Sequence, residues 1–263
     1  MVGNRPPILI LRAAGTNRDR EAAWACELAG GAPEIVDIRQ LVSGERRLAD
    51  FLMLVLPGGF SYGDDLGAGR LLAVRLRHQL GDALAEFIAS GRPVLGICNG
   101  FQALVKAGAL PGDSAGGLAE PRLTLTRNDS ARFECRWIHL RPEPGSRCIF
   151  TRGLDELIEC PVAHGEGKLV ARDPETLNAL QAAGQIALRY VDADGRPTGY
   201  PGNPNGSPLG IAGVCNASGN LLGLMPHPED HALEVQHPRR GRGAPGALGL
   251  VLFENGVQHA RSL

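Results

Sequence analysis

The stretch Pro93-Val-Leu-Gly-Ile-Cys98-Asn-Gly-Phe-Gln-Ala-Leu-Val105 joins a short apolar run to an apolar segment with helical spacing. Such a junction predicts a buried strand that turns sharply into a helix, with glycines on both sides of Cys98 to permit the turn. The turn would raise the Cys98 side chain above the sheet edge, at a helix N-terminus where a thiolate is stabilised. Cys98 is therefore a candidate nucleophile. The alternative is that Cys98 is a small buried hydrophobic residue, the usual role of a free cysteine.

The chain before and around this turn alternates between apolar runs and amphipathic segments. We expect strands at residues 8–11, 34–38, 52–56 and 93–97, and helices at residues 16–28 and 71–88. Repeated strand–helix units predict a parallel sheet with helices on both faces. Active sites in such sheets lie at the carboxyl ends of the strands, where Cys98 would be found.

From Leu123 onward the pattern changes to short alternating segments that are typical of antiparallel strands. Strands are expected at residues 123–126, 133–137, 157–162, 186–191, 209–214 and 221–225, with helices at 174–183 and 246–260. No internal repeat or linker is visible. We therefore expect a single α/β domain over residues 1–263, with a mostly parallel sheet and an antiparallel extension in the C-terminal half.

The composition excludes several classes of function. The net charge of −1 over 263 residues gives no electrostatic reason to expect a nucleic acid or membrane partner. The six cysteines form no Cys-x-x-Cys pair, which argues against a zinc site and a disulfide framework. With no signal-like or membrane-spanning apolar stretch, a soluble cytoplasmic protein is expected.

A cysteine nucleophile needs a general base and a group that orients the base. The segment Leu224-Met-Pro-His227-Pro-Glu229 offers both, because an apolar run leads to His227 and Glu229 follows two residues later. A hydrogen bond from the imidazole to Glu229 would fix the tautomer and stabilise the imidazolium. A surface His-Pro turn is the alternative. A metal site formed with His231 and His237 is disfavoured, because Pro228 breaks the helical spacing between ligands.

The third element is Leu56-Pro-Gly-Gly-Phe-Ser-Tyr-Gly-Asp64. The unhindered backbone N–H groups of Gly58 and Gly59 suit an oxyanion hole, with the N–H of Asn99 as the second donor. A tight turn that needs glycine is an alternative compatible with this function. Ser61 also lies in a Gly-x-Ser-x-Gly pattern, but that pattern does not follow its strand directly. Similarly, the Gly-x-Gly-x-x-Gly pattern at residues 241–246 follows no strand, so it predicts a loop.

These motifs together resemble class I glutamine amidotransferases, and more narrowly the glutaminase subunits of phosphoribosylformylglycinamidine synthases. The narrower resemblance rests on Gly15-Thr-Asn17, residues 56–64, Ala163-His-Gly-Glu-Gly167, Asn203-Pro-Asn-Gly-Ser207 and Met225-Pro-His-Pro-Glu229. The chain departs from many relatives at Arg18-Asp19 and at Lys168, and has extra residues around 141–160 and 236–245. These departures leave the docking surface for a partner undefined.

The resemblance implies a flavodoxin-like three-layer sandwich and the hydrolysis of L-glutamine to L-glutamate and ammonia. Cys98 would form the thioester, His227 would move the protons and Glu229 would hold the imidazole, while the N–H groups of Gly59 and Asn99 would bind the oxyanion. By motif match, the residues that contact glutamine would be Gly58, Phe60, Gln102 and His164. No metal or cofactor is expected on this chain.

Ammonia at neutral pH is mostly ammonium, which is not a nucleophile, so a biosynthetic glutaminase needs a sealed path to its acceptor. The chain shows no ATP site, which places the acceptor on another protein. The resemblance implies an ATP- and Mg-dependent synthetase subunit, with or without a small bridging subunit. This subunit would convert formylglycinamide ribonucleotide to the amidine in purine biosynthesis. Two other hypotheses remain open: a free-standing cysteine hydrolase and a non-catalytic docking subunit.

Overall fold

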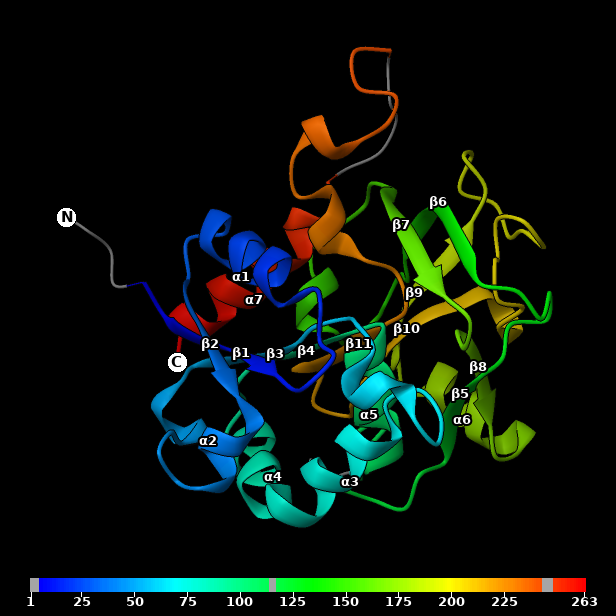
Figure 1. The fold of residues 1–263 in the computed structure, drawn as a ribbon. Helices are drawn as coiled ribbons and strands as arrows, with labels where there is room; N and C mark the ends of the chain where they lie inside the picture. The colour runs from blue at the N-terminus through cyan, green and yellow to red at the C-terminus, as the bar shows by residue number, and fades with distance from the viewer. Residues whose placement is uncertain (1–4, 114–116, 243–247) are drawn as a thin grey trace.

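The computed structural model describes residues 5–113, 117–242 and 248–263. Its main feature is a nine-stranded sheet with the strand order β2-β1-β3-β4-β11-β10-β9-β6-β7 (Figure 1). The strands are β1 (Pro7–Arg12), β2 (Ala32–Asp37), β3 (Met53–Leu56), β4 (Val94–Ile97), β6 (Glu134–Pro142), β7 (Ile158–His164), β9 (Ile186–Val191), β10 (Ile211–Cys215) and β11 (Leu221–Leu224). A separate two-stranded antiparallel sheet pairs β5 (Leu123–Thr126) with β8 (Lys168–Ala171).

Five neighbouring strands, β2, β1, β3, β4 and β11, pair in parallel. The apolar runs of β1, β3, β4 and β11 are buried, as parallel strands between two helix layers require, whereas β2 at the edge of the sheet is mostly half-buried. Helices α1 (Asp19–Leu28) and α7 (Leu250–Arg261) cover one face, whereas α3 (Arg70–Gln79), α4 (Gly81–Ala89) and α5 (Asn99–Ala107) cover the other (Figure 1). This arrangement confirms the predicted flavodoxin-like three-layer α/β architecture. Helix α2 (Ile38–Val42) follows β2, and α6 (Pro174–Ala182) follows β8.

The C-terminal half contributes the antiparallel extension. In it β11 pairs with β10, β10 with β9, β9 with β6 and β6 with β7, each antiparallel to its neighbour. Strand β11, however, returns to the centre and pairs in parallel with β4, with Leu224 opposite Ile97. The carboxyl ends of these two strands carry Cys98 and the segment that leads to His227. Strand pairing therefore brings together two sequence motifs that are more than a hundred residues apart.

Several sequence-based boundaries were wrong, among them the following three. The single helix predicted at residues 71–88 is two helices, because Leu80 leaves the helical conformation with φ −127° and Gly81 begins α4. The strand predicted from Leu209 begins at Ile211, because Leu209 has φ 55° in a short 3₁₀ turn. The closing helix predicted from residue 246 begins at Leu250, while residues 243–247 lie outside the described part. Strand β8, which is only four residues long, was not predicted.

The segment predicted as extra around residues 141–160 packs under the C-terminal helix. Phe150 lies in a short 3₁₀ turn and is fully buried, and its carbonyl accepts a hydrogen bond from Asn255 at 2.9 Å. A Cβ atom on Gly256 would lie 2.6 Å from the Phe150 ring, so the helix approaches this turn closely only because residue 256 is glycine. This segment therefore completes the core beneath α7.

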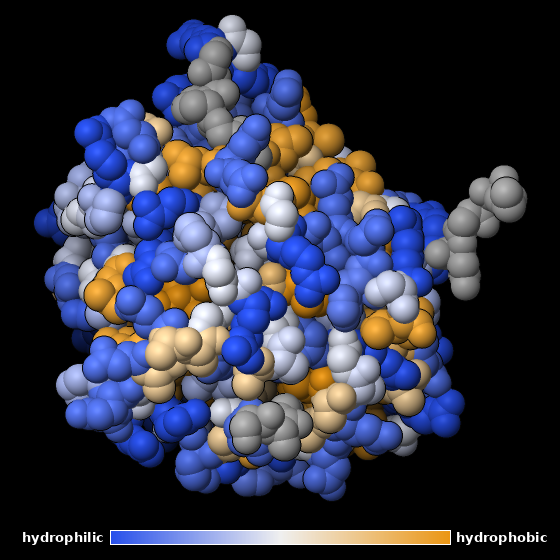
Figure 2. Space-filling model, turned by 180° about the vertical axis from the view of Figure 1, so that it is seen from behind, coloured by the Kyte–Doolittle hydropathy of each residue, from blue (hydrophilic) through white to orange (hydrophobic). Residues whose placement is uncertain are grey.

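The molecular surface mixes polar and apolar groups. Seen from behind, hydrophilic side chains surround several separate apolar patches (Figure 2). Within the described residues, none of the helices has the length and apolar character needed to cross a membrane.

Candidate active site

Cys98 lies at a strained turn between β4 and α5. Its backbone has φ 49° and ψ −104°, a conformation that non-glycine residues rarely adopt, and its N–H donates to the carbonyl of Leu224 at 2.8 Å. Strain of this kind persists only where the surrounding structure enforces it, and it clusters at functional sites. The Cys98 side chain is 6% exposed and its Sγ approaches the carbonyl of Ala163 at 3.8 Å.

The glycines around Cys98 provide space, whereas the strained dihedral falls on the cysteine itself. A Cβ atom on Gly100 would lie 2.0 Å from the carbonyl oxygen of Leu56, and one on Gly96 would lie 2.4 Å from the Leu104 side chain. Neither glycine has a positive φ. The prediction that these glycines permit a turn too tight for residues with a Cβ atom is therefore confirmed. They allow α5 to begin directly against the sheet, which places its N-terminus at Cys98.

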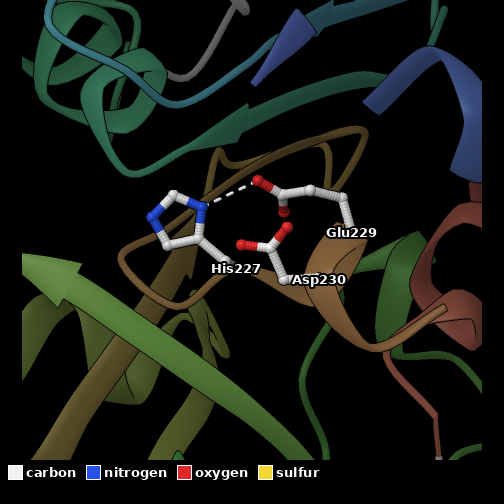
Figure 3. Close-up of side chains that lie close together, drawn as sticks. All are labelled: His227, Glu229 and Asp230. Carbon is white, nitrogen blue, oxygen red and sulfur yellow. Dashed lines mark hydrogen bonds and ion pairs between the residues drawn. The ribbon is translucent and has the colours of Figure 1, made fainter. Parts of the chain in front are cut away.

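His227 and Glu229 follow β11 and form a buried pair (Figure 3). The Nδ1 atom of His227 lies 2.7 Å from Oε1 of Glu229, and the two residues are 3% and 0% exposed. The N–H of His227 donates to the carbonyl of Pro161 at 2.8 Å, which fixes the segment against β7. The predicted pairing of histidine and glutamate is thus present, and the alternative of a surface His-Pro turn is excluded by burial.

The charges around His227 favour its protonated form. Burial lowers the pKa of His227, but Glu229 and Cys98 outweigh this effect and hold the pKa well above the usual value for histidine. A Cβ atom on Gly58 would lie 2.6 Å from Cε1 of His227 and 3.4 Å from Cβ of Cys98, so both side chains border the same backbone. The second ring nitrogen, Nε2, has no hydrogen-bond partner in the described part of the chain. It is therefore free to exchange a proton with a group bound beside Cys98.

The loop after β3 places backbone N–H groups beside Cys98. Gly59 has φ 141°, and a Cβ atom there would lie 2.6 Å from the backbone nitrogen of Asn17, so only glycine fits. The loop is held by the bridge between Thr16 and Gly59 and by the hydrogen bond from Phe60 N–H to Gly15 at 3.1 Å. Among described residues, neither the N–H of Gly59 nor that of Asn99 has a protein acceptor. Both N–H groups remain able to bind an oxyanion.

These elements enclose a pocket of about 390 Å³ at the carboxyl ends of β3, β4, β7 and β11. Its lining residues are Asn17, Arg18, Gly59, Phe60, Asp64, Ala68, Cys98, Gln102, Phe133, Ala163, His164, Gly165, Glu166 and His227. Of the predicted glutamine contacts, Phe60, Gln102 and His164 line it. Gly58 does not, and instead makes room for His227.

The side chains of Asn99 and Gln102 shape one wall of the pocket. Asn99 donates through Nδ2 to Asp64 at 2.8 Å and to Gln102 at 3.1 Å, and its Oδ1 accepts from the Ser61 hydroxyl at 2.5 Å. Gln102 donates in turn to the carbonyl of Glu166 at 2.7 Å. Ser61 is 2% exposed and serves this network, so the alternative of a serine nucleophile has no structural support.

His164, in the Ala163–Gly167 motif, is buried in the pocket wall without a hydrogen bond to its ring. Both ring nitrogens lack a partner among the described residues. Burial and the nearby His227 lower the pKa of His164 to about 4, so the imidazole is neutral at physiological pH. A Cβ atom on Gly167 would lie 2.5 to 2.8 Å from the His164 ring, which explains the glycine in this motif.

The resemblance predicted that the segment with His164 and Glu166 lies near the glutamine site or a subunit interface, whereas Asp64 was named only as part of a motif. Both Asp64 and Glu166 line the pocket, and their place within those motifs was the available signal. Phe133 had no such signal, because it precedes β6 and reaches the pocket only through the fold. Arg18, a departure from many relatives, forms ion pairs with Glu21 at 3.4 Å and Asp230 at 3.6 Å at the edge of the pocket.

The described residues contain one cluster of potential metal ligands, formed by His227, Glu229 and Asp230, whose ligand atoms lie within 4.8 Å (Figure 3). The Nδ1 atom of His227 is already engaged by Glu229, which suits orientation of the imidazole. The histidines of the disfavoured metal hypothesis point elsewhere. His231 and His237 pack edge-on against Trp137 and contact Glu159, with 3.2 Å between His237 Nε2 and Glu159 Oε2.

Comparison with known proteins agrees with this geometry. A family model described as a CobB/CobQ-like glutamine amidotransferase domain matches residues 5–260, so the fold and site define a glutamine amidotransferase. The phosphoribosylformylglycinamidine synthase subunit PurQ of Dehalococcoides mccartyi is 49% identical over 97% of this chain and 98% of its own length. PurQ of Treponema denticola is 48% identical over 97% and 99%. The solved PurLQS structure from Thermotoga maritima matches with a TM-score of 0.73 and 32% identity over 97% of this chain and 99% of that chain. The chain belongs to the PurQ family of phosphoribosylformylglycinamidine synthase subunits.

Proposed function

We propose that the chain hydrolyses L-glutamine to L-glutamate and ammonia through a thioester on Cys98. The ammonia is delivered to a synthetase partner that converts formylglycinamide ribonucleotide to formylglycinamidine ribonucleotide in purine biosynthesis. The observation that carries this proposal is the strained Cys98 beside the buried His227–Glu229 pair in one pocket. Membership of the PurQ family supports the pathway. One sheet that contains strands from both halves of the chain supports a single domain over residues 1–263.

The geometry assigns a role to each group. The Cys98 thiolate attacks the carboxamide carbon, and the N–H groups of Gly59 and Asn99 hold the oxyanion. When the intermediate collapses, the C–N bond breaks and the His227 imidazolium gives its proton to the departing nitrogen, which leaves as ammonia. His227, now neutral, takes a proton from water as the water attacks the thioester. Glutamate then leaves and the Cys98 thiolate is restored, with Glu229 stabilising the imidazolium at each stage.

Phe60, Gln102 and His164 are proposed to contact glutamine directly, and Gly58 to act by leaving space beside His227. Phe60 lines the pocket and is 45% exposed, which suits the closure of a site over its substrate. Gln102 is held by Asn99 and Glu166, so its amide is already oriented before a ligand binds.

A partner is needed because ammonia released into water becomes ammonium. The solved Thermotoga maritima relative carries the name PurLQS, which supports an assembly that contains further subunits. We propose a synthetase subunit that binds ATP and Mg and covers the pocket mouth, with or without a small bridging subunit.

The test is glutamate release and amidine formation, measured for wild type and Cys98→Ala with the co-purified synthetase. We expect Cys98→Ala to abolish glutamine-dependent synthesis and to leave ammonia-dependent synthesis intact. Loss of both activities would make Cys98 a structural residue. Equal glutamate release with and without the synthetase would favour a free-standing hydrolase instead.

A further inference from the structure

The pocket contains two carboxylates, Asp64 and Glu166, that the proposed reaction does not use. Each is anchored through one oxygen. Asp64 accepts at Oδ1 from Gly69 N–H at 3.2 Å and from the Asn99 side chain, and Glu166 accepts at Oε2 from Ala68 N–H at 3.3 Å. In the described part of the structure, no donor reaches the second oxygen of either carboxylate. Two acceptor oxygens of fixed position therefore remain for a ligand.

The local charge balance favours a cation between these carboxylates. Neither Asp64 nor Glu166 forms an ion pair with a described residue, and the nearby Lys106 donates instead to the carbonyl of Leu125 at 3.4 Å. Burial raises the pKa of Asp64 and the negative charge of Glu166 adds to this effect, and together they outweigh the lowering by the hydrogen bonds from Gly69 and Asn99 and by the charge of Lys106. A positively charged group that binds to both oxygens would relieve this repulsion and replace the lost hydration.

A second observation indicates that this wall binds a polar ligand. His164 is only 2% exposed and lines the same pocket. Neither of its ring nitrogens has a hydrogen-bond partner among the described residues. Buried polar groups in folded proteins are normally hydrogen-bonded, so unpartnered nitrogens that border a pocket are typical of a binding site without its ligand. The backbone carbonyl of Glu166 also orients Gln102, which ties this wall to the helix that begins at Cys98.

We propose that Asp64 and Glu166 bind the α-ammonium group of the substrate amino acid and thereby select L-glutamine from other primary amides. This inference rests on the proposed function, because it takes the substrate carboxamide to lie at Cys98. The zwitterionic glutamine then presents its ammonium group to the two carboxylates. The neutral His164 ring can form hydrogen bonds with the remaining polar atoms of the glutamine. Asp64 and Glu166 would make the pocket specific for an amino acid, whereas the groups around Cys98 alone would accept any primary amide.

The test compares L-glutamine with glutaramate, the analogue that lacks the α-amino group, as substrates of the assembled complex. In Glu166→Gln, which keeps the shape and one acceptor, kcat/KM for L-glutamine should fall at least about tenfold, mainly through KM. The value for glutaramate should not change. Asp64→Asn should have the same effect, whereas Asp65→Asn, an exposed neighbour, should have none. An equal loss for both substrates, or no loss for L-glutamine, would overturn the inference.

A binding measurement separates this inference from the proposed function. The Cys98→Ala chain is titrated with L-glutamine and with glutaramate by calorimetry, with and without Glu166→Gln. Selective loss of L-glutamine affinity in the double variant supports the ammonium site even if no hydrolysis is observed. Unchanged affinity in the double variant overturns the site while leaving Cys98-dependent hydrolysis untouched.

Discussion

Replacement of Glu229 by glutamine tests whether the buried pair serves catalysis or only the core. In wild type, the carboxylate lies 2.7 Å from Nδ1 of His227 and is fully buried, so its charge acts on the imidazolium with little screening. Glutamine has the same shape and can still accept the imidazole N–H. The substitution therefore removes the negative charge with little change in packing.

The size of the effect follows from the burial of the pair. Removing one partner of a buried ion pair costs about 3–5 kcal/mol, and each 1.36 kcal/mol of transition-state stabilisation is about a tenfold change in rate. This free energy corresponds to a fall in turnover of about two to four powers of ten. We expect about two powers of ten, because the hydrogen bond is kept. The free energy of unfolding should change by less, about 2 kcal/mol or less, because the buried imidazole of the variant can lose its proton and then leaves no unpaired charge in the core.

The assay is steady-state glutamate release by the complex, with thermal unfolding measured on the same preparations. Glu234→Gln, an exposed glutamate on the following turn, is the matched control and should match wild type in both measurements. Turnover within threefold of wild type would refute the role of the charge. A Glu229→Gln chain that fails to fold would show that the carboxylate belongs to the core.

Two further substitutions test the oxyanion donors and the buried histidine. Gly59→Ala should lower kcat about a hundredfold, because a Cβ atom would lie 2.6 Å from Asn17 N and displace a donor N–H. Gly91→Ala is the control, because Gly91 also has a positive φ but a Cβ atom there would meet no neighbour. This variant measures the effect of backbone strain alone and should keep full activity. The pKa of His164 is about 4 in the folded chain and near 6.5 when unfolded, so only the unfolded state takes up its proton between these values. Stability from this residue is present above about pH 6.5 and is lost as the pH falls toward 4, by about 3 kcal/mol in total. Denaturant titrations of wild type and His164→Gln should show a weaker loss over that window in the variant, and parallel curves would contradict the buried neutral state.

The sequence was sufficient for the elements whose signals are local. Residues 8–11 and 93–97 read as buried strands because their apolar runs are continuous, and the structure confirms both. The helix break at Leu80 was missed because the apolar spacing of α3 continues into α4, so periodicity alone could not show where the backbone leaves the helix. Strand β8 was missed because only Leu169 of its four residues is buried, so the strand shows neither a continuous apolar run nor an alternation.

The same division applies to the site. His227 and Glu229 were predicted because a short spacing along an extended chain brings them together. Phe133 was not, because its place at the pocket depends on how β6 crosses the sheet, which no local pattern encodes. Gly58 was predicted to contact glutamine. The structure instead shows that Gly58 leaves space for the ring of His227, a residue far away in sequence.

The distance between Cys98 and His227, the proposed nucleophile and base, depends on the packing of glycines beneath them. Leu224 pairs with Ile97, so Cys98 and the segment that leads to His227 leave the sheet at the same level. A Cβ atom on Gly223 would lie 2.1 Å from the Phe101 ring, so α5 can approach β11 only because residue 223 has no side chain. Gly100 has the same role toward β3, where a Cβ atom would meet the Leu56 carbonyl. Because close packing leaves no room to compensate, a side chain at either glycine would move the helix that carries Cys98 relative to the strand that carries His227. The glycines around this turn therefore help to set the proposed catalytic geometry through their packing against neighbouring elements.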